Sequence, residues 1–211
     1  MIALDAPGCG SKRGRDTAAL DVDAVVTELL AEISAHGLKE VVLVGHSQAG
    51  TILPRLVEKQ PGLFRRVVYV SCIAPLPGRS IVQQMGSGPQ GSNQDEVGWP
   101  FDPKTISAGK RYSLMFCNDM SEDETAAFLA KLGHDAWPAQ TMRASDWRYD
   151  ALSGVPSTYV VCLRDGVLPV PWQETFATRL KVQRQARIDA GHQVMNTRPY
   201  ALAEVLRKEA L

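Results

Sequence analysis

The sequence lacks any hydrophobic run close to the roughly 20 residues that a membrane-spanning helix needs. It also lacks a net charge, because 23 basic residues balance 23 acidic ones. A neutral chain offers no electrostatic reason for nucleic acid or an anionic membrane to be the main partner. The short basic cluster of Lys12, Arg13 and Arg15 is expected to be a solvated loop.

Cysteine is scarce and scattered, which argues against zinc or redox chemistry. The four cysteines are Cys9, Cys72, Cys117 and Cys162, and no two of them form a CxxC pair. Cys72 and Cys162 sit in apolar runs and are expected to be small buried hydrophobes. The start, Met1–Asp5, turns acidic too soon for a signal peptide. With cysteines that are scattered or buried, a reduced, cytoplasmic setting is predicted.

What the sequence does have is the composition of an ordinary globular domain. Its 211 residues are 45% hydrophobic and 22% charged, enough for one core with or without a small accessory lobe. Short β-branched runs alternate with amphipathic stretches, which is typical of a parallel sheet covered by helices on both faces. The predicted strands are Met1–Asp5, Val41–Val44, Val67–Val70, Thr158–Leu163 and Gln183–Ile188.

The helices are predicted from spacing and from their end signals. Apolar residues from Val22 to Ile33 recur at helical intervals until Gly37 ends the helix. A second helix is expected from about Gln48 to Lys59, with a kink at Pro54, which cannot donate to the preceding turn. Two more are predicted over Trp172–Leu180 and from Pro199 to about Arg207.

Between residues 74 and 154 this alternation stops, and Pro, Gly, Ser and Asn become frequent. One helix is still indicated there, because Ser121 and Glu124 have the spacing of a capping box and Gly133 follows as a stop. Its aromatic residues supply enough apolar area to pack, which argues against a disordered loop. We therefore predict a core in two parts, residues 1–73 and 155–211, with a lid inserted at 74–154.

The chemistry centres on Ser47 in the run Gly45-His46-Ser47-Gln48-Ala49-Gly50. A serine between a buried strand and a helix is typical of a nucleophile elbow, where a strained turn exposes the hydroxyl. The turn needs small residues on both sides, here Gly45 and Ala49, although the usual pattern has glycine at the second position. The Gln48 N–H at the helix start is the predicted oxyanion donor. The alternative is an ordinary glycine-rich turn.

A serine hydroxyl needs a base to act as a nucleophile at neutral pH, and the chain has four histidines. His36 lies at a helix end and His134 follows the predicted lid helix. His46 is expected to face away from the elbow and to pack. His192 follows a strand and the Gly191 turn, at the sheet edge where Ser47 should emerge, and it is the predicted base.

The base in turn needs an acid that holds its tautomer. Asp165 follows the strand Thr158–Leu163 at the same edge, and it completes the chain order Ser, Asp, His expected of this arrangement. The rival aspartates are Asp119, Asp146, Asp150 and Asp189.

Several stretches together resemble one group of α/β-hydrolases, which holds plant methyl esterases, hydroxynitrile lyases and bacterial pyrethroid-type carboxylesterases. The matching stretches are Ile2–Gly10, Val42–Ser47, Asn118–Asp123, Val161–Asp165 and Gly191–His192. The resemblance implies the α/β-hydrolase fold, the triad Ser47, Asp165 and His192, and no metal or organic cofactor. Hydroxynitrile lyases of the group place a lysine directly after the histidine. Gln193 stands there in this chain, so lyase activity is not expected.

The start of the chain departs from the group. Its members begin with a strand leading into a His-Gly loop, whose N–H is the second oxyanion donor, whereas the match here starts with Met1–Asp5 as the fourth strand. Either Met1–Asp5 pairs directly with Val41–Val44, or a groove is left for another chain to fill. The loop Ala6–Gly10 could supply the donor through Gly8 or Gly10, or the sequence upstream of Met1 could. One such donor is worth roughly 2.7–4 kcal/mol.

The predicted function is a serine esterase that hydrolyses a small hydrophobic carboxylic ester through an acyl-enzyme. The alternatives are a lactonase or acyltransferase built on the same site, and a binding module impaired by the missing oxyanion loop. The expected partner is a small-molecule ester, with neither nucleic acid nor membrane involved. A homodimer is left open.

Overall fold

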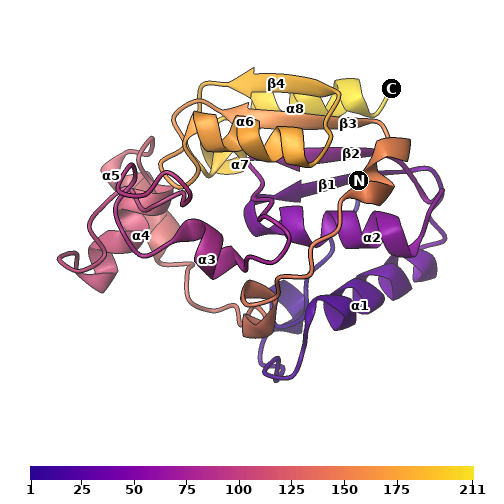
Figure 1. Cartoon of the computed structure of the whole chain (residues 1–211), viewed down its shortest axis with the longest axis horizontal. Helices are drawn as coiled ribbons and strands as arrows, with labels where there is room; N and C mark the ends of the chain where they lie inside the picture. The colour runs from indigo at the N-terminus through magenta and orange to yellow at the C-terminus, as the bar shows by residue number, and fades with distance from the viewer.

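A four-stranded, fully parallel sheet forms the centre of the molecule (Figure 1). The computed structural model describes residues 1–211 apart from the side chain of Ala108. The strands are β1 (Val41–His46), β2 (Phe64–Val70), β3 (Ser157–Cys162) and β4 (Arg184–Ile188), and they lie side by side in chain order. The predicted parallel sheet is confirmed, and so are four of its five predicted strands.

Helices cover both faces of this sheet, as predicted. They are α1 (Val22–Ala35), α2 (Leu53–Lys59), α6 (Val170–Arg179), α7 (Val194–Thr197) and α8 (Pro199–Glu209). In Figure 1, α1, α2 and α6 lie in front of the sheet and α8 lies behind it. Alternation along β2 separates two hydrophobic clusters, because Val67 and Tyr69 belong to the larger one and Val68 and Val70 to the smaller.

The segment from residue 74 to 154 connects β2 to β3. It holds α3 (Ile81–Met85), α4 (Ala108–Phe116) and α5 (Glu122–Leu129), and the short 3-10 helices Ala139–Met142 and Asp150–Gly154. Figure 1 shows α3, α4 and α5 grouped beyond the ends of the strands marked by the arrowheads. The predicted capping box at the start of α5 is confirmed, with both bonds between Ser121 and Glu124 present. None of the helices that the structure describes is long and apolar enough to cross a membrane.

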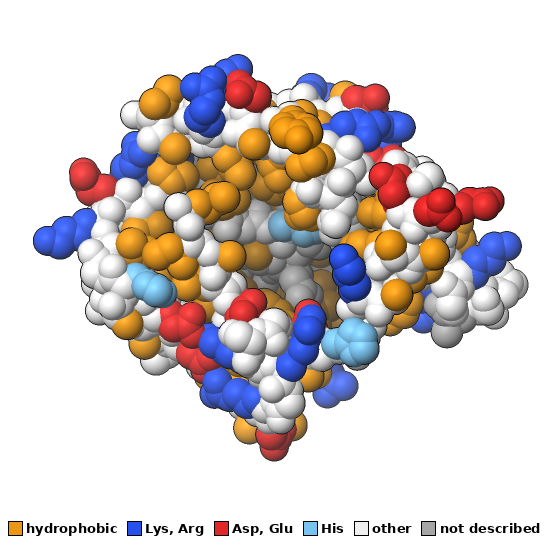
Figure 2. Space-filling view, turned by 180° about the vertical axis from the view of Figure 1, so that it is seen from behind, with side chains coloured by type: hydrophobic (Ala, Val, Ile, Leu, Met, Phe, Trp, Pro, Cys, Tyr) orange, Lys and Arg blue, Asp and Glu red, His pale blue; other side chains and the backbone are white. Residues whose placement is uncertain are grey.

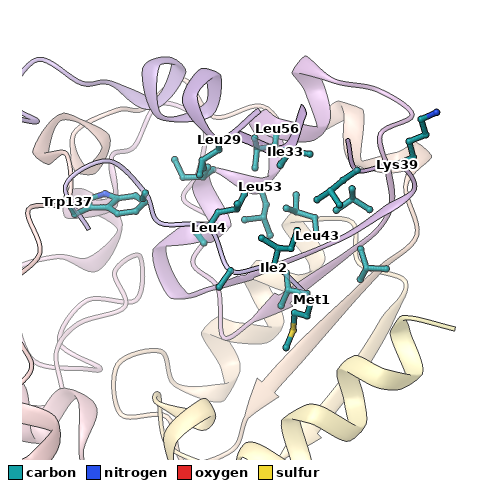
Figure 3. Close-up of a pocket in the computed structure, with 18 residues that line it drawn as sticks. Met1, Ile2, Leu4, Leu29, Ile33, Lys39, Leu43, Leu53, Leu56 and Trp137 are labelled. Atoms are coloured by element: carbon teal, nitrogen blue, oxygen red, sulfur yellow. The ribbon is translucent and has the colours of Figure 1, made fainter. Parts of the chain in front are cut away.

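The prediction of a strand at Met1–Asp5 is wrong. A strand requires a hydrogen-bonded partner. Met1–Asp5 pairs with none of the described strands, and β1 stays the edge strand of the sheet, bonded to β2 alone. Direct pairing with Val41–Val44 is therefore wrong as well. Instead a largely apolar groove of about 630 Å³ runs along β1, and Figure 3 shows Ile2 and Leu4 extending across it toward Leu43 and Leu53.

The predicted kink at Pro54 is also wrong. The chain after β1 forms a 3-10 helix, Ser47–Thr51, and α2 starts only at Leu53. Pro54 thus lies in the first turn of α2, where the N–H that proline lacks would have had no acceptor within the helix. The break falls before the proline, and α2 needs no bend.

Helix α2 supports the turn that follows β1, so its buried face should dominate local stability. Leu56 is 2% exposed and belongs to the larger cluster, whereas Leu76 is 43% exposed. We expect Leu56→Ala to lower the free energy of unfolding by about 2–5 kcal/mol, through lost burial and a residual cavity. The matched Leu76→Ala should change it by less than about 0.5 kcal/mol. Urea unfolding followed by circular dichroism measures both, and equal effects would contradict this assignment of the core.

Candidate active site

The turn after β1 has the strained backbone predicted for an elbow. Ser47 has φ of +54°, a left-handed conformation that non-glycine residues rarely adopt. A Cβ on Gly45 would lie 2.8 Å from the Ala49 Cβ and 2.6 Å from a Leu53 methyl carbon, so the strand and helix approach closely here. The Ser47 carbonyl accepts a hydrogen bond from the Ile73 N–H at 3.0 Å, which ties the turn to the end of β2.

The structure brings together the three residues predicted to form the triad. His192 Nε2 lies 2.9 Å from Ser47 Oγ, and His192 Nδ1 lies 2.7 Å from Asp165 Oδ2. The His192 and Asp165 side chains are essentially buried, at 1% and 0% exposure. A carboxylate that accepts the Nδ1–H leaves Nε2 free to take a proton from the serine hydroxyl. The arrangement can therefore generate an alkoxide-like nucleophile at neutral pH.

The Asp165 carboxylate is held by four hydrogen bonds. Oδ1 accepts the N–H groups of Val167 and Leu168, and Oδ2 accepts the Ser71 hydroxyl as well as His192 Nδ1–H. Burial alone would raise the pKa of this carboxyl. The charge of His192 and the bonds from His192, Ser71 and Leu168 outweigh burial and hold the pKa below its ordinary value. Asp165 is therefore ionised at neutral pH.

The other candidates lie elsewhere. His36 and His134 are exposed, His36 at the end of α1 as predicted. The rival aspartates have other partners: Arg55 for Asp146, Lys181 for Asp150, Arg164 for Asp189 and the Gly191 N–H for Asp119. Among the aspartates that the structure describes, only Asp165 lies within hydrogen-bond distance of the His192 ring.

The sequence missed one supporting residue, Ser71, and predicted the role of a second, His46, only in part. Ser71, with φ of +40°, donates to Asp165, and the sequence hint was a small polar residue directly after a buried strand. His46 packs as predicted, but it packs against His192, with ring centroids 4.6 Å apart, so the expectation that it faces away from the elbow is wrong. Its Nε2–H also donates to the His192 carbonyl at 2.8 Å, a contact between residues 146 positions apart that no local pattern indicates.

The structure shows what the N–H groups of the predicted oxyanion donors, Gln48, Gly8 and Gly10, can still bind. Gln48 is the second residue of the 3-10 helix after β1, so its N–H has no acceptor within the helix and stays the predicted donor. The suggestion that Gly10 supplies a second donor is wrong, because the Gly10 N–H already donates to the Asp135 carboxylate at 3.1 Å. The Gly8 carbonyl accepts the Ala136 N–H, which fixes this loop to residues 135 and 136. Gly8 itself stays a predicted donor.

Comparisons with known proteins agree with this architecture. The model of the alpha/beta hydrolase family matches residues 1–205. A curated relative, "Probable hydrolase R7" from a Phoma species, is 28% identical over 220 residues, covering 99% of this chain and 86% of its own length.

Two solved structures share the fold. One, described as an extracellular alpha/beta-hydrolase from a Paenibacillus species, has a TM-score of 0.76 and 21% identity. The match covers 97% of this chain and 85% of that one. A pyrethroid hydrolase from Sphingobium faniae has a TM-score of 0.72 and 18% identity, with 98% and 84% covered. The predicted α/β-hydrolase fold is confirmed.

The close approach at the elbow predicts a steric limit at Gly45. We expect Gly45→Ala to lower the free energy of unfolding by about 1–3 kcal/mol, because its methyl would overlap Ala49 and Leu53. Gly154→Ala is the matched control, since a Cβ there meets nothing within 4 Å. Thermal unfolding of both variants measures the difference. A Gly45→Ala variant as stable as the control would show that the elbow tolerates a larger residue.

The lowered pKa of His46 predicts that the free energy of unfolding falls in mild acid. Burial and the charge of His192 lower the pKa of His46 from 6.5 to about 3. Below about pH 6.5 the unfolded chain therefore binds a proton at His46 that the folded chain does not bind, so stability falls as the pH drops toward 3. Between about pH 7.5 and pH 5, we expect the native protein to lose about 2 kcal/mol more than His46→Gln.

Urea unfolding at the two pH values measures this difference. His36→Gln is the control, because it removes one histidine at an exposed position away from the His46–His192 contact. Parallel pH dependence in the native protein and in His46→Gln would contradict the prediction.

Proposed function

The chain belongs to the alpha/beta hydrolase family, and on that premise we propose that it is a serine esterase acting on a small hydrophobic carboxylic ester. The observation that carries the proposal is the continuous hydrogen-bond chain from Ser47 through His192 to Asp165. A buried, ionised acid, an oriented imidazole and a hydroxyl on a strained turn are the parts that acyl transfer needs.

The proposed reaction has two stages. Ser47 Oγ attacks the ester carbonyl carbon while its proton passes to His192 Nε2, and Asp165 stabilises the imidazolium. The Gln48 N–H binds the oxyanion of the tetrahedral intermediate. Collapse breaks the bond to the alcohol, which leaves with the proton from His192. Water then attacks the acyl-enzyme by the same route and releases the carboxylic acid and Ser47.

A hydrophobic substrate is supported by the side chains next to the base. The Phe116 ring stacks near His192, with centroids 5.8 Å apart, and Tyr112 and Phe128 each lie about 6 Å from Phe116. Figure 2 shows one face of the molecule hollowed, with hydrophobic side chains around the hollow and a histidine inside it. Apolar walls with a few convergent polar groups are typical of small-molecule sites. The segment 74–154, which supplies these aromatics, fits the role of a lid.

The proposal is tested by turnover of a p-nitrophenyl ester and by labelling with a fluorophosphonate, which reacts with activated serines. The native protein should turn over the ester and carry the label on Ser47. Ser47→Ala and His192→Ala should each lower kcat by about 10⁴-fold or more, and Asp165→Asn by about 10⁴-fold. Ser87→Ala, at an exposed serine, should leave kcat unchanged.

Mass spectrometry of the labelled peptide identifies the modified residue. A folded native protein that neither turns over the ester nor carries the label would overturn the proposed function. Full activity in His192→Ala would overturn the assignment of the base.

A further inference from the structure

Asp119 belongs to the connection between α4 and α5, yet its side chain is 0% exposed because it is buried against the loop that carries His192. Its Oδ2 accepts the N–H of Gly191 at 2.7 Å, and Gly191 directly precedes His192. A residue of the segment 74–154 thus fixes the peptide bond that leads into His192, the proposed base. The proposed reaction does not otherwise use this carboxylate.

The neighbouring Asn118 makes the corresponding contact with the loop of the acid. Its Nδ2 donates to the carbonyl of Arg164 at 2.6 Å, and Arg164 directly precedes Asp165. The two loops are also bonded to each other, because the Arg164 N–H donates to the Ala190 carbonyl at 2.9 Å. Two consecutive residues of the inserted segment therefore bind the residues that come just before the acid and the base.

Gly191 makes this approach possible. A Cβ there would lie 2.4 Å from Asp119 Oδ1 and 2.6 Å from Asn118 Oδ1, both of them impossible contacts. Asp119 Oδ1 is buried without a hydrogen-bond partner among the described atoms, and the Arg164 guanidinium is 3.9 Å from Oδ2. A buried carboxylate with one unsatisfied oxygen is costly for the fold, so its stabilising value alone does not account for it.

We propose that Asp119 is a positioning residue for the base, holding the Gly191–His192 peptide so that His192 Nε2 points at Ser47. The proposal rests on the proposed function, in which His192 is the base. Asp119 touches neither the substrate nor the reacting atoms. Its effect passes through one charge-assisted hydrogen bond, which is shorter and stronger than a bond to a neutral acceptor.

The experiment compares Asp119→Ala, Asp119→Asn and the control Asp123→Ala in the full chain, with p-nitrophenyl ester turnover as the readout. Asp123 is an exposed acidic residue of the same segment. Asp119→Ala should lower kcat by about 10²-fold, the cost of an imidazole displaced by about 1 Å, and leave KM within about two-fold. Asp119→Asn should restore kcat to within about five-fold, because its amide oxygen can accept the same N–H. Asp123→Ala should match the native protein.

A second readout separates positioning from general damage. The rate of fluorophosphonate labelling at Ser47 should fall in parallel with kcat, while the thermal unfolding midpoint of Asp119→Asn stays near the native one. If Asp119→Ala does not fold, Asp119→Ser replaces it, since serine remains polar but is too short to reach the Gly191 N–H.

The proposal would be overturned by a native kcat in folded Asp119→Ala or Asp119→Ser, or by a rise in KM of these variants with kcat unchanged. It would also be overturned if folded Asp119→Asn had a kcat as low as that of the alanine variant. These outcomes are distinct from failure of the proposed function, in which the native protein itself shows neither turnover nor label.

Discussion

Four strands run parallel and stop at a common edge, and every residue of the candidate site depends on that arrangement. Ser47 follows β1, Ser71 follows β2, Asp165 lies three residues beyond β3 and His192 four residues beyond β4. Each strand thus ends next to one of the four residues whose side chains are joined by hydrogen bonds at this edge. Since side chains alternate along a strand, a slip of one residue in any pairing would turn a member away from the others.

The buried Asp165 carboxylate at this edge is stable because hydrogen bonds satisfy both of its oxygens. A carboxylate removed from water is costly unless hydrogen bonds replace its hydration. Asp165 has such bonds from two backbone N–H groups, a serine hydroxyl and an imidazole. The Gln173 side chain hydrogen-bonds to the backbone of Cys162 and Leu168, the residues on either side of the Asp165 loop. These bonds hold the loop that carries Asp165 in place before a substrate binds. Little rearrangement of the carboxylate is then needed during the proposed reaction.

Local patterns predicted the features that depend on local physics. Composition and spacing located four of the strands, and position at a strand end indicated Ser47, Asp165 and His192. The failures share a cause. Met1–Asp5 has strand composition, but a strand is defined by its hydrogen-bonded partner, and this segment does not bond to the open side of the edge strand β1. The roles of Ser71, His46 and Asp119 depend on contacts with residues between 72 and 146 positions away, which no local spacing encodes.

The segment 74–154, which connects β2 to β3, also contacts the candidate site. His192 is held at three points: its Nδ1 by Asp165, its carbonyl by His46 and the preceding N–H by Asp119. The first two come from the sheet core, whereas the third comes from residues 74–154. With the ring and its backbone fixed on these sides, Nε2 is the polar atom that faces Ser47. Since the aromatic side chains beside His192 belong to the same segment as Asp119, the wall that would contact a substrate and the carboxylate that orients the base are parts of one structural unit. The geometry of the base therefore depends on how that segment is seated against the sheet edge.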